Sequence, residues 1–156
     1  MQRRTLILTL AVLCSLTVVL NMAAAGGSKK SDSKVKAKIV SSKLSSTGQQ
    51  TVTIELKVDK GWYIYANPVG NKLLAPNATT VKVKGNVKGV KVAFPIPKVK
   101  KDDVIGDYNY YQGKILLNVS MQNPSKQATD FVIQVNACDS VRGICLQPGQ
   151  LKLSTK

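Results

Sequence analysis

Two cysteines near the C-terminal end, Cys138 and Cys145, are the residues whose side chains best suit chemistry. A pair of thiols can join as a disulfide and exchange that bond with the thiols of another protein. The sequence has no histidine, so the commonest general base and metal ligand is missing and a catalytic triad of the usual kind is excluded. Thiol–disulfide chemistry is therefore the first reaction to consider.

The remaining cysteine, Cys14, lies in an N-terminal stretch with the features of a secretory signal peptide. Arg3 and Arg4 precede a long apolar run, and three alanines lead up to Gly26, which predicts cleavage just before this glycine. Export brings a protein into an oxidising compartment, where a pair of cysteines tends to form a disulfide. We therefore expect residues 1–25 to be a signal peptide and the mature protein to be periplasmic or secreted.

The chain after the signal peptide is predicted to consist of a short linker and one domain. Residues 26–34 are glycine, serine and lysine with one aspartate, a composition that buries no apolar surface, so we expect a flexible linker. Residues 35–156 are enough to enclose a hydrophobic core. No second apolar stretch approaches the roughly 20 residues that cross a bilayer, so the mature protein is not expected to span the membrane.

A formal net charge of +15 favours acidic partners or anionic surfaces. The lysines are dispersed and do not alternate with aromatic residues as they do in nucleic-acid grooves, so nucleic acid is not an expected partner. Two cysteines with scattered aspartates do not suffice for a zinc site, and no phosphate-binding loop is present, so no metal or cofactor is expected. Glu55 is predicted to point to solvent from a strand.

Apolar residues recur at every second position over most of the domain, which is typical of strands with one buried face. The alternation is clearest in residues 35–39, 52–58, 81–83, 115–119, 131–135 and 151–153. Turn-forming glycine, proline, asparagine and serine residues separate these segments, and no window shows a sustained helical stripe. The pattern predicts an all-β fold, an immunoglobulin-like antiparallel β-sandwich.

The two cysteines are predicted to face each other across a hairpin, at a distance that permits a disulfide. Cys138 ends the strand predicted up to Ala137, and Cys145 opens the last strand after a short polar turn. On the loop-entropy model, closing so small a ring stabilises the fold by roughly 2 to 3 kcal/mol. Arg142 would stabilise a thiolate and Asp139 would oppose one, so charge favours Cys145 as the attacking sulfur.

The residues alone leave the role of this disulfide open. A bridge at a loop mouth is accessible to an exchanging partner, whereas most cysteine pairs of secreted proteins are structural. In the first case the protein is a thiol–disulfide oxidoreductase-type electron relay. The alternatives are a secreted immunoglobulin-like binding or scaffold module with a structural disulfide, and a lysine-driven binder of anionic polymers or envelope surfaces.

Three segments resemble the N-terminal periplasmic domain of the thiol:disulfide interchange protein DsbD. They are residues 61–68 (GWYIYANP), residues 94–97 with 108–119, and residues 137–148 around both cysteines. The resemblance implies an immunoglobulin-like sandwich that takes electrons from a thioredoxin-like donor and passes them to disulfide isomerases or cytochrome-maturation proteins, which makes thioredoxin-fold proteins the expected partners. The family's membrane electron-transfer domain does not occur in this sequence, so a separate membrane protein is a further expected partner.

The resemblance also implies roles for individual residues. Cys145 matches the family's attacking cysteine and Cys138 matches its resolving partner. Tyr63 and Tyr65 match aromatic positions that flank the cysteines, and they suit packing within a sheet equally well. A cap loop that folds over the disulfide and lifts when a partner docks corresponds to Asp102, Asp103, Val104 and Ile105. Val104 and Ile105 replace the aromatic cap tip of the best-known members.

Overall fold

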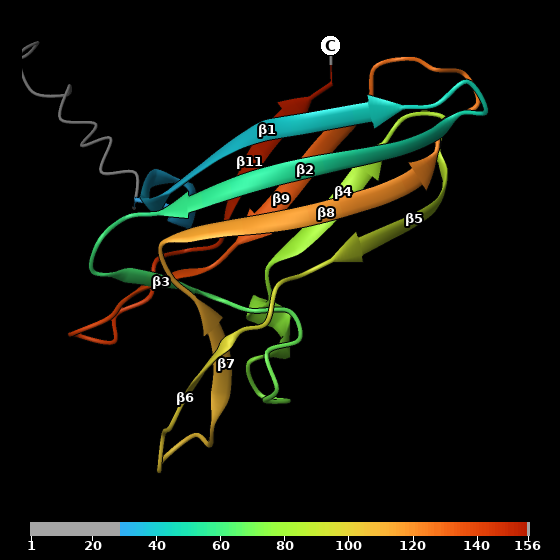
Figure 1. Cartoon of the computed structure of the whole chain (residues 1–156). Coiled ribbons are helices and arrows are strands. Elements are labelled where there is room, and N and C mark those ends of the chain that lie inside the picture. The colour runs from blue at the N-terminus through green and yellow to red at the C-terminus, as the bar shows by residue number, and fades with distance from the viewer. Residues whose placement is uncertain (1–28, 156) are drawn as a thin grey trace, which may run out of the picture.

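The computed structural model describes residues 29–155, so the predicted signal peptide lies outside the described residues. Figure 1 shows two β-sheets stacked on each other and a third sheet of shorter strands at one end of the stack. Neighbouring strands are antiparallel in all three sheets. This arrangement confirms the predicted all-β, immunoglobulin-like sandwich.

The two stacked sheets have four and three strands. The first sheet consists, in spatial order, of β1 (Val35–Leu44), β2 (Gln49–Val58), β8 (Lys114–Gln122) and β5 (Lys88–Ala93). The second sheet consists of β11 (Gly149–Ser154), β9 (Asp130–Val135) and β4 (Thr80–Lys84). Alternate residues of these strands point into the space between the sheets, as their alternating sequences predicted.

The hydrophobic core fills the space between the two stacked sheets. Ile54 and Leu117 from the first sheet and Phe131 and Ile133 from the second have no solvent exposure and belong to one contiguous cluster. Burial of each such side chain contributes about 1.5 to 3 kcal/mol to stability. The sandwich is therefore held together by this core, and neither cysteine belongs to the cluster.

The third sheet carries one cysteine and lies at one end of the sandwich (Figure 1). It consists, in spatial order, of β10 (Ala137–Asp139), β3 (Trp62–Tyr65), β7 (Tyr108–Tyr111) and β6 (Lys98–Lys100). In its register Cys138 lies opposite Tyr63, and Tyr65 lies opposite Tyr110. The aromatic residues of β3 and β7 are thereby placed next to the cysteine.

The sequence predicted the six alternating strands but missed β3, β5, β6, β7 and β10, and it placed a turn at Lys88, where β5 begins. Strand β3 buries three consecutive residues, Tyr63, Ile64 and Tyr65, so it has no period-two pattern to detect. Strands β6 and β10 contain three residues each, too few to show a period. Within residues 29–155, two short 3-10 helices accompany the strands, namely η1 (Ser31–Lys34) and η2 (Ala75–Asn77).

Part of the predicted linker is structured, which corrects the expected start of the ordered chain. Residues 31–34 form η1, and Ser31 is fully buried although its neighbours are small and polar. Its backbone N–H donates a hydrogen bond to the Gln147 carbonyl (2.9 Å). Composition predicted a linker because polar residues bury little apolar area, but here specific hydrogen bonds fix the segment.

Glu55 is also buried to a greater extent than the alternation predicted. The residue is 9% exposed, and its carboxylate lies 3.3 Å from Lys38 Nζ and 3.2 Å from Lys114 Nζ. Its hydrogen bond with Lys114, followed by the one with Lys38, lowers the pKa of Glu55, against the opposing effect of burial. The side chain does lie on the outer face of the sheet, but the two neighbouring lysines cover it.

Candidate functional site: the Cys138–Cys145 disulfide

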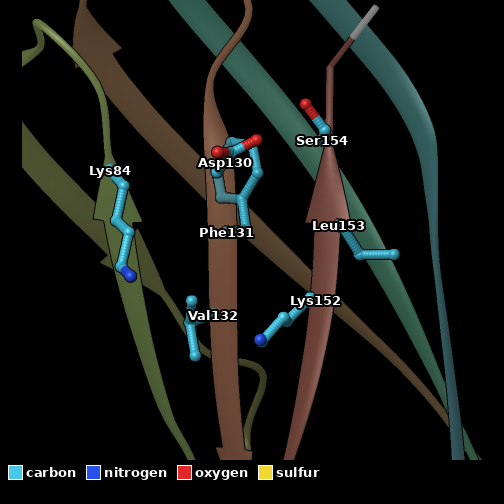
Figure 2. A pocket seen from close by; sticks show the side chains of 7 residues that line it. All are labelled: Lys84, Asp130, Phe131, Val132, Lys152, Leu153 and Ser154. Carbon is cyan, nitrogen blue, oxygen red and sulfur yellow. The ribbon is translucent and has the colours of Figure 1, made fainter.

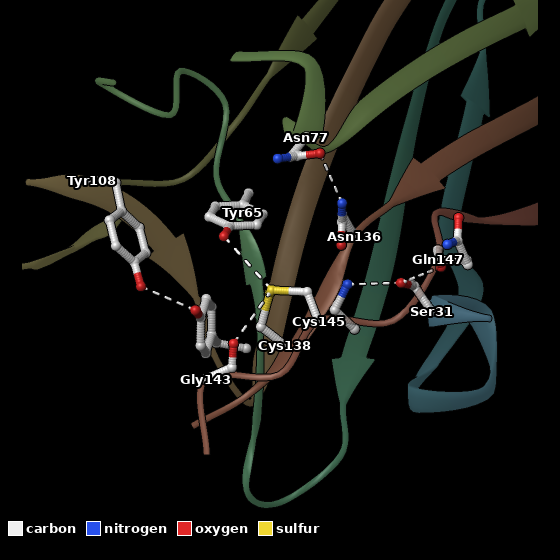
Figure 3. Close-up of a disulfide and its surroundings, with 11 residues drawn as sticks. Ser31, Tyr65, Asn77, Tyr108, Asn136, Cys138, Gly143, Cys145 and Gln147 are labelled. Carbon is white, nitrogen blue, oxygen red and sulfur yellow. Dashed lines mark hydrogen bonds between the residues drawn. A yellow bond between two sulfur atoms is a disulfide. The ribbon is translucent and has the colours of Figure 1, made fainter. Parts of the chain in front are cut away.

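Cys138 and Cys145 form a disulfide across two antiparallel segments at the end of the sandwich (Figure 3). The Cα atoms lie 4.0 Å apart and the sulfur atoms 2.04 Å apart. Two backbone hydrogen bonds of 2.9 Å flank the pair, one from Asp139 N–H to the Ile144 carbonyl and one from Leu146 N–H to the Ala137 carbonyl. The cysteines thus occupy a non-hydrogen-bonded cross-strand pair, where facing residues approach most closely.

The position of Cys145 differs from the sequence prediction. The last strand, β11, begins only at Gly149, and Cys145 forms an isolated bridge opposite Cys138 before that strand starts. The segment from Cys145 to Pro148 therefore lies outside the two stacked sheets. The predicted hairpin geometry of the two cysteines is nevertheless present.

The two cysteines differ sharply in exposure. Cys138 has no solvent exposure and packs with Tyr63, Tyr65 and Tyr108, whereas Cys145 is an exposed residue. An external thiolate must approach a disulfide sulfur from outside the protein, in line with the bond that breaks. Of the two cysteines, Cys145 is therefore the one within reach of another protein.

The loop between the cysteines is organised around Asp139. One carboxylate oxygen accepts hydrogen bonds from the backbone N–H groups of Val141 and Arg142, each at 2.9 Å, and the other accepts two from the Arg142 guanidinium. These hydrogen bonds, the one from the Arg142 backbone first, lower the pKa of Asp139 to about 2. Gly143, at φ +69°, completes the turn in a conformation that favours glycine.

Pairing of Asp139 with Arg142 changes the electrostatic argument made from the sequence. The sequence predicts that the two charges act on a thiolate in opposite directions. They form an ion pair of 2.9 Å, so their effects on a nearby sulfur largely cancel. The preference for Cys145 as the reacting sulfur therefore rests on its exposure and not on the charge of the loop.

A cluster of tyrosines lies against the disulfide. The Tyr65 hydroxyl lies 3.8 Å from Cys145 Sγ and donates to it, and the Tyr63 and Tyr108 hydroxyls share a hydrogen bond of 3.0 Å (Figure 3). The rings of Tyr63 and Tyr65 meet edge to face with centroids 5.9 Å apart. The predicted proximity of Tyr63 and Tyr65 to the cysteines is thus observed, and the two side chains are also packed within the cluster.

Burial raises the pKa values of the Tyr63 and Tyr65 hydroxyl groups and so keeps them protonated. Desolvation is the largest cause that raises the pKa of Tyr65, and the negative charge of Asp102 acts in the same direction. The pKa of Tyr63 is raised further, again mainly by burial and then by its hydrogen bond with Tyr108. A neutral phenol donates a hydrogen bond, so Tyr65 can stabilise negative charge on Cys145 Sγ.

The four residues of the predicted cap lie at the tip of the β6–β7 hairpin, which projects from the sandwich in Figure 1. The Asp102 carboxylate accepts hydrogen bonds from the N–H groups of Val104 (3.0 Å) and Ile105 (3.1 Å), and Asn71 Nδ2 donates to the Ile105 carbonyl (2.7 Å). Val104 is 92% exposed. Within the part of the chain that the structure describes, no hydrogen bond or ion pair joins this tip to either cysteine.

The end of β6 next to this tip does reach the tyrosine cluster. Lys100 Nζ lies 5.1 Å from the centroid of the Tyr63 ring and 5.8 Å from that of Tyr108. The hairpin therefore covers the buried side of the site while Cys145 stays exposed. Lys100 was not among the predicted site residues, since a lysine in an alternating lysine segment carries no distinctive signal.

Two further residues of the site were missed. Tyr108 lies in a segment that carried the family resemblance, so the resemblance contained the signal. Ser31 lies in the predicted linker, where a single serine among glycines and lysines gave none. Its hydroxyl accepts a hydrogen bond from Ala137 N–H and donates one to the Gln147 carbonyl (both 2.8 Å), next to the cysteines (Figure 3).

A shallow pocket of about 400 Å³ lies elsewhere, on the sheet formed by β4, β9 and β11 (Figure 2). It is lined by residues of these three strands, and neither cysteine is among them: Lys84, Asp130, Phe131, Val132, Lys152, Leu153 and Ser154. Among residues 29–155 no three histidine, cysteine or acidic side chains gather as metal ligands would. Nor does that part of the chain contain a helix with the length and apolar character needed to cross a membrane.

Comparison with known proteins places the chain in a family. Its sequence matches the family described as "Thiol:disulfide interchange protein DsbD, N-terminal" over residues 33–155. No curated protein matches it significantly. The match covers nearly all of the described residues and includes both cysteines.

Solved structures of low sequence identity show the same fold. The reduced DsbD N-terminal domain of Neisseria meningitidis is 14% identical with a TM-score of 0.53, over 78% of this chain and 83% of that one. The N-terminal periplasmic domain of ScsB from Proteus mirabilis is 17% identical with a TM-score of 0.58, over 86% of this chain and 49% of that one.

A third structure contains the complex between the DsbD N-terminal and PilB N-terminal domains of Neisseria meningitidis. It is 11% identical with a TM-score of 0.50, over 81% of this chain and 85% of that one. These likenesses establish the fold, and the sequence match establishes the relationship. With its paired cysteines at the end of an immunoglobulin-like sandwich, the chain belongs to the family of N-terminal domains of the thiol:disulfide interchange protein DsbD.

Proposed function

We propose that this domain relays electrons in the periplasm by exchanging its Cys138–Cys145 disulfide with thioredoxin-fold proteins. The observation that carries the proposal is the contrast between an exposed Cys145 and a fully buried Cys138 within one disulfide. A purely structural bridge has no need of an exposed cysteine. The family membership and the predicted signal peptide support the same reaction and compartment.

Reduction of the domain proceeds in two exchanges. A donor thiolate attacks Cys145 Sγ, the bond between the two cysteines breaks, and Cys138 leaves as a thiolate that takes up a proton. The donor's second thiolate then attacks the donor's first sulfur, which is bonded to Cys145 in the mixed disulfide, and Cys145 is released as a thiolate. The donor ends as a disulfide and this domain as a dithiol, so two electrons have moved.

Oxidation of the domain uses the same sulfur atoms in reverse. The Cys145 thiolate attacks an acceptor disulfide, and the acceptor's leaving sulfur departs as a thiolate. Cys138 then attacks Cys145 Sγ and releases the reduced acceptor. Because Cys138 is buried beside Tyr63, it resolves this intermediate from within the protein, while Cys145 alone forms bonds to partners.

The expected partners have the thioredoxin fold with two active-site cysteines. A related DsbD N-terminal domain forms a complex with a PilB N-terminal domain, which supports recognition of a separate protein by this fold. The source of electrons is proposed to be a separate membrane electron-transfer protein. Asp102, Asp103, Val104 and Ile105 are proposed to adjust access to Cys145 when a partner docks.

The decisive experiment traps the mixed disulfide. The Cys138→Ala variant is incubated with a thioredoxin whose resolving cysteine is changed to alanine and whose remaining thiol is activated as an aryl disulfide. We expect a covalent one-to-one complex, joined by a disulfide to Cys145, that a reductant cleaves. The Cys145→Ala variant is the matched control and should form at least tenfold less complex. Equal yields from both variants, or none from Cys138→Ala, would refute the proposal.

The second candidate is a binding or scaffold module whose disulfide is structural. The complete burial of Cys138 favours this reading, because a buried sulfur resists reduction. It predicts a reduction potential below about −300 mV, whereas a relay requires a less negative value. Equilibration of the protein with glutathione gives this potential. Measurement of this potential separates the two candidates without the need for a natural partner.

A further inference from the structure

The segment Lys30–Lys34, called here the N-terminal segment, joins the backbone on both sides of the disulfide. The Ser31 hydroxyl accepts a hydrogen bond from Ala137 N–H and donates one to the Gln147 carbonyl, each at 2.8 Å. Ser31 N–H donates a second hydrogen bond to the same carbonyl, at 2.9 Å. Ala137 precedes Cys138 directly, and Gln147 follows Cys145 by two residues. One side chain thus connects the two cysteine arms (Figure 3).

This connection is buried and closely packed. Ser31 and Ala137 have no solvent exposure, so the Ala137 N–H loses its hydrogen-bond partner if the hydroxyl is removed. At Gly149 a β-carbon would lie 2.6 Å from Asp32 Oδ1, a separation that real β-carbons do not show. The glycine therefore permits the close approach of the N-terminal segment. Two separate features of the sequence, Ser31 and Gly149, support the same contact.

We propose that Ser31 is a positioning residue that favours the disulfide form of Cys138–Cys145. With its hydrogen bonds in place, both cysteine arms are fixed where the Cα atoms lie 4.0 Å apart. Reduction frees the Cys145 arm from the covalent bond, so Gln147 is no longer forced to stay within reach of the hydroxyl. The contact is then worth more in the oxidised state than in the reduced state.

Coupling of this kind is reciprocal. If the disulfide strengthens the Ser31 contact, the contact must favour the disulfide by the same factor. Removal of the hydroxyl should therefore make the bond easier to reduce, with a less negative potential. A contact that only supported the fold would stabilise the oxidised and reduced states equally and would leave the potential unchanged.

The test measures the equilibrium of the disulfide with two molecules of glutathione, which yields the dithiol and one glutathione disulfide. We expect Ser31→Ala to shift this equilibrium about tenfold toward the dithiol, or about 30 mV for a two-electron couple. The control is Ser33→Ala, the same change in the same helix, because the Ser33 hydroxyl donates only to the Lys30 carbonyl at 2.7 Å. Its equilibrium should match that of the unmodified protein.

A second variant approaches the contact from the opposite side. Gly149→Ala keeps the Ser31 hydroxyl but displaces Asp32, so it should shift the equilibrium in the same direction. If Ser31→Ala fails to fold, the glutathione equilibrium of Gly149→Ala tests the proposal instead, and a shift toward the dithiol supports it. The proposal is overturned if the variants destabilise both redox forms equally and leave the equilibrium with glutathione unchanged.

This inference rests on the proposed function only in assuming that the bond opens and closes in use. The two can fail separately, since the glutathione equilibrium involves no protein partner. A shift in Ser31→Ala without any trapped thioredoxin complex would support the positioning role and refute the relay. A trapped complex without a shift in Ser31→Ala would support the relay and refute the positioning role.

Discussion

Arg142 donates two hydrogen bonds to the Asp139 carboxylate inside the loop that separates the cysteines, at 3.1 Å from Nε and 2.9 Å from a terminal nitrogen. This ion pair makes the loop nearly neutral next to the reacting sulfur atoms. Without Arg142, the Asp139 charge would act unopposed on a thiolate at Cys145.

Replacement of Arg142 by alanine should make the reduced Cys145 less reactive. The variant leaves the Asp139 charge uncompensated, and a nearby negative charge disfavours a thiolate. We expect alkylation of the Cys145 thiol by iodoacetamide at pH 7 to slow by about two- to fivefold, since the rate follows the thiolate fraction. The double change of Arg142→Ala with Asp139→Asn should restore the rate. Faster alkylation of the single variant would contradict the prediction.

The stability contribution of Asp139 should depend on pH in a defined window. The folded-state pKa of Asp139 is lowered from 3.8 to about 2, so its contribution is complete above the unfolded value near 4. It is lost as the pH falls through about 2. In thermal unfolding, the protein should be more stable than Asp139→Asn above pH 4, and the two midpoints should converge near pH 2. A constant difference between pH 2 and 6 would show that the charge is not responsible.

The Tyr65 hydroxyl should assist the thiolate form of Cys145. Tyr65→Phe removes the donor 3.8 Å from Cys145 Sγ, and we expect alkylation of the reduced protein to slow by about two- to fivefold. Tyr63→Phe is the matched control, because the Tyr63 hydroxyl pairs with Tyr108 instead of sulfur. That variant should keep the alkylation rate but lose about 1 kcal/mol of unfolding free energy. Equal rate effects in the two variants would argue against a direct contact with sulfur.

Reduction of the disulfide should lower stability without unfolding the domain. The bond closes a loop with a sequence separation of 7, which on the entropy model contributes about 2 kcal/mol. Urea unfolding of the oxidised and reduced forms, followed by circular dichroism, should show midpoints that differ accordingly and the same β-rich signal in the absence of urea. Loss of that signal on reduction would mean that the bridge is a structural necessity.

A core substitution should cost more than reduction. Leu117 has no solvent exposure and lies in the cluster between the stacked sheets, so Leu117→Ala should lower the unfolding free energy by about 2 to 5 kcal/mol. The same variant should leave the glutathione equilibrium of the cysteines unchanged, provided that it is measured well below the unfolding temperature. A shift in that equilibrium would show that the core and the site are coupled.

The sandwich could be predicted from the sequence because its strands alternate. Segments such as Val52 to Val58 and Phe131 to Val135 place every second residue in the core, and the structure buries them as expected. The site was harder to predict. Strand β3 is buried at consecutive positions, and its role was apparent only from the resemblance of the Trp62–Tyr65 segment to a known family.

Other parts of the site carry no periodic signal at all. Ser31 is fixed by hydrogen bonds to backbone atoms more than a hundred residues away, and no local pattern encodes such a contact. The same holds for the pairing of Asp139 with Arg142, because a sequence shows both charges but not whether they touch. The exposure of the hairpin tip at Val104 likewise depends on how β6 and β7 leave the sandwich.

The separation of the tyrosine cluster from the main core has a consequence for the lifetime of the protein. Phe131 belongs to one cluster and Cys138 to another, so we expect the main core to stay enclosed in both oxidation states of the cysteines. Repeated turnover then disturbs only one extremity of the molecule. The domain can then be reduced and reoxidised many times without exposing the unfolded segments that envelope proteases cleave.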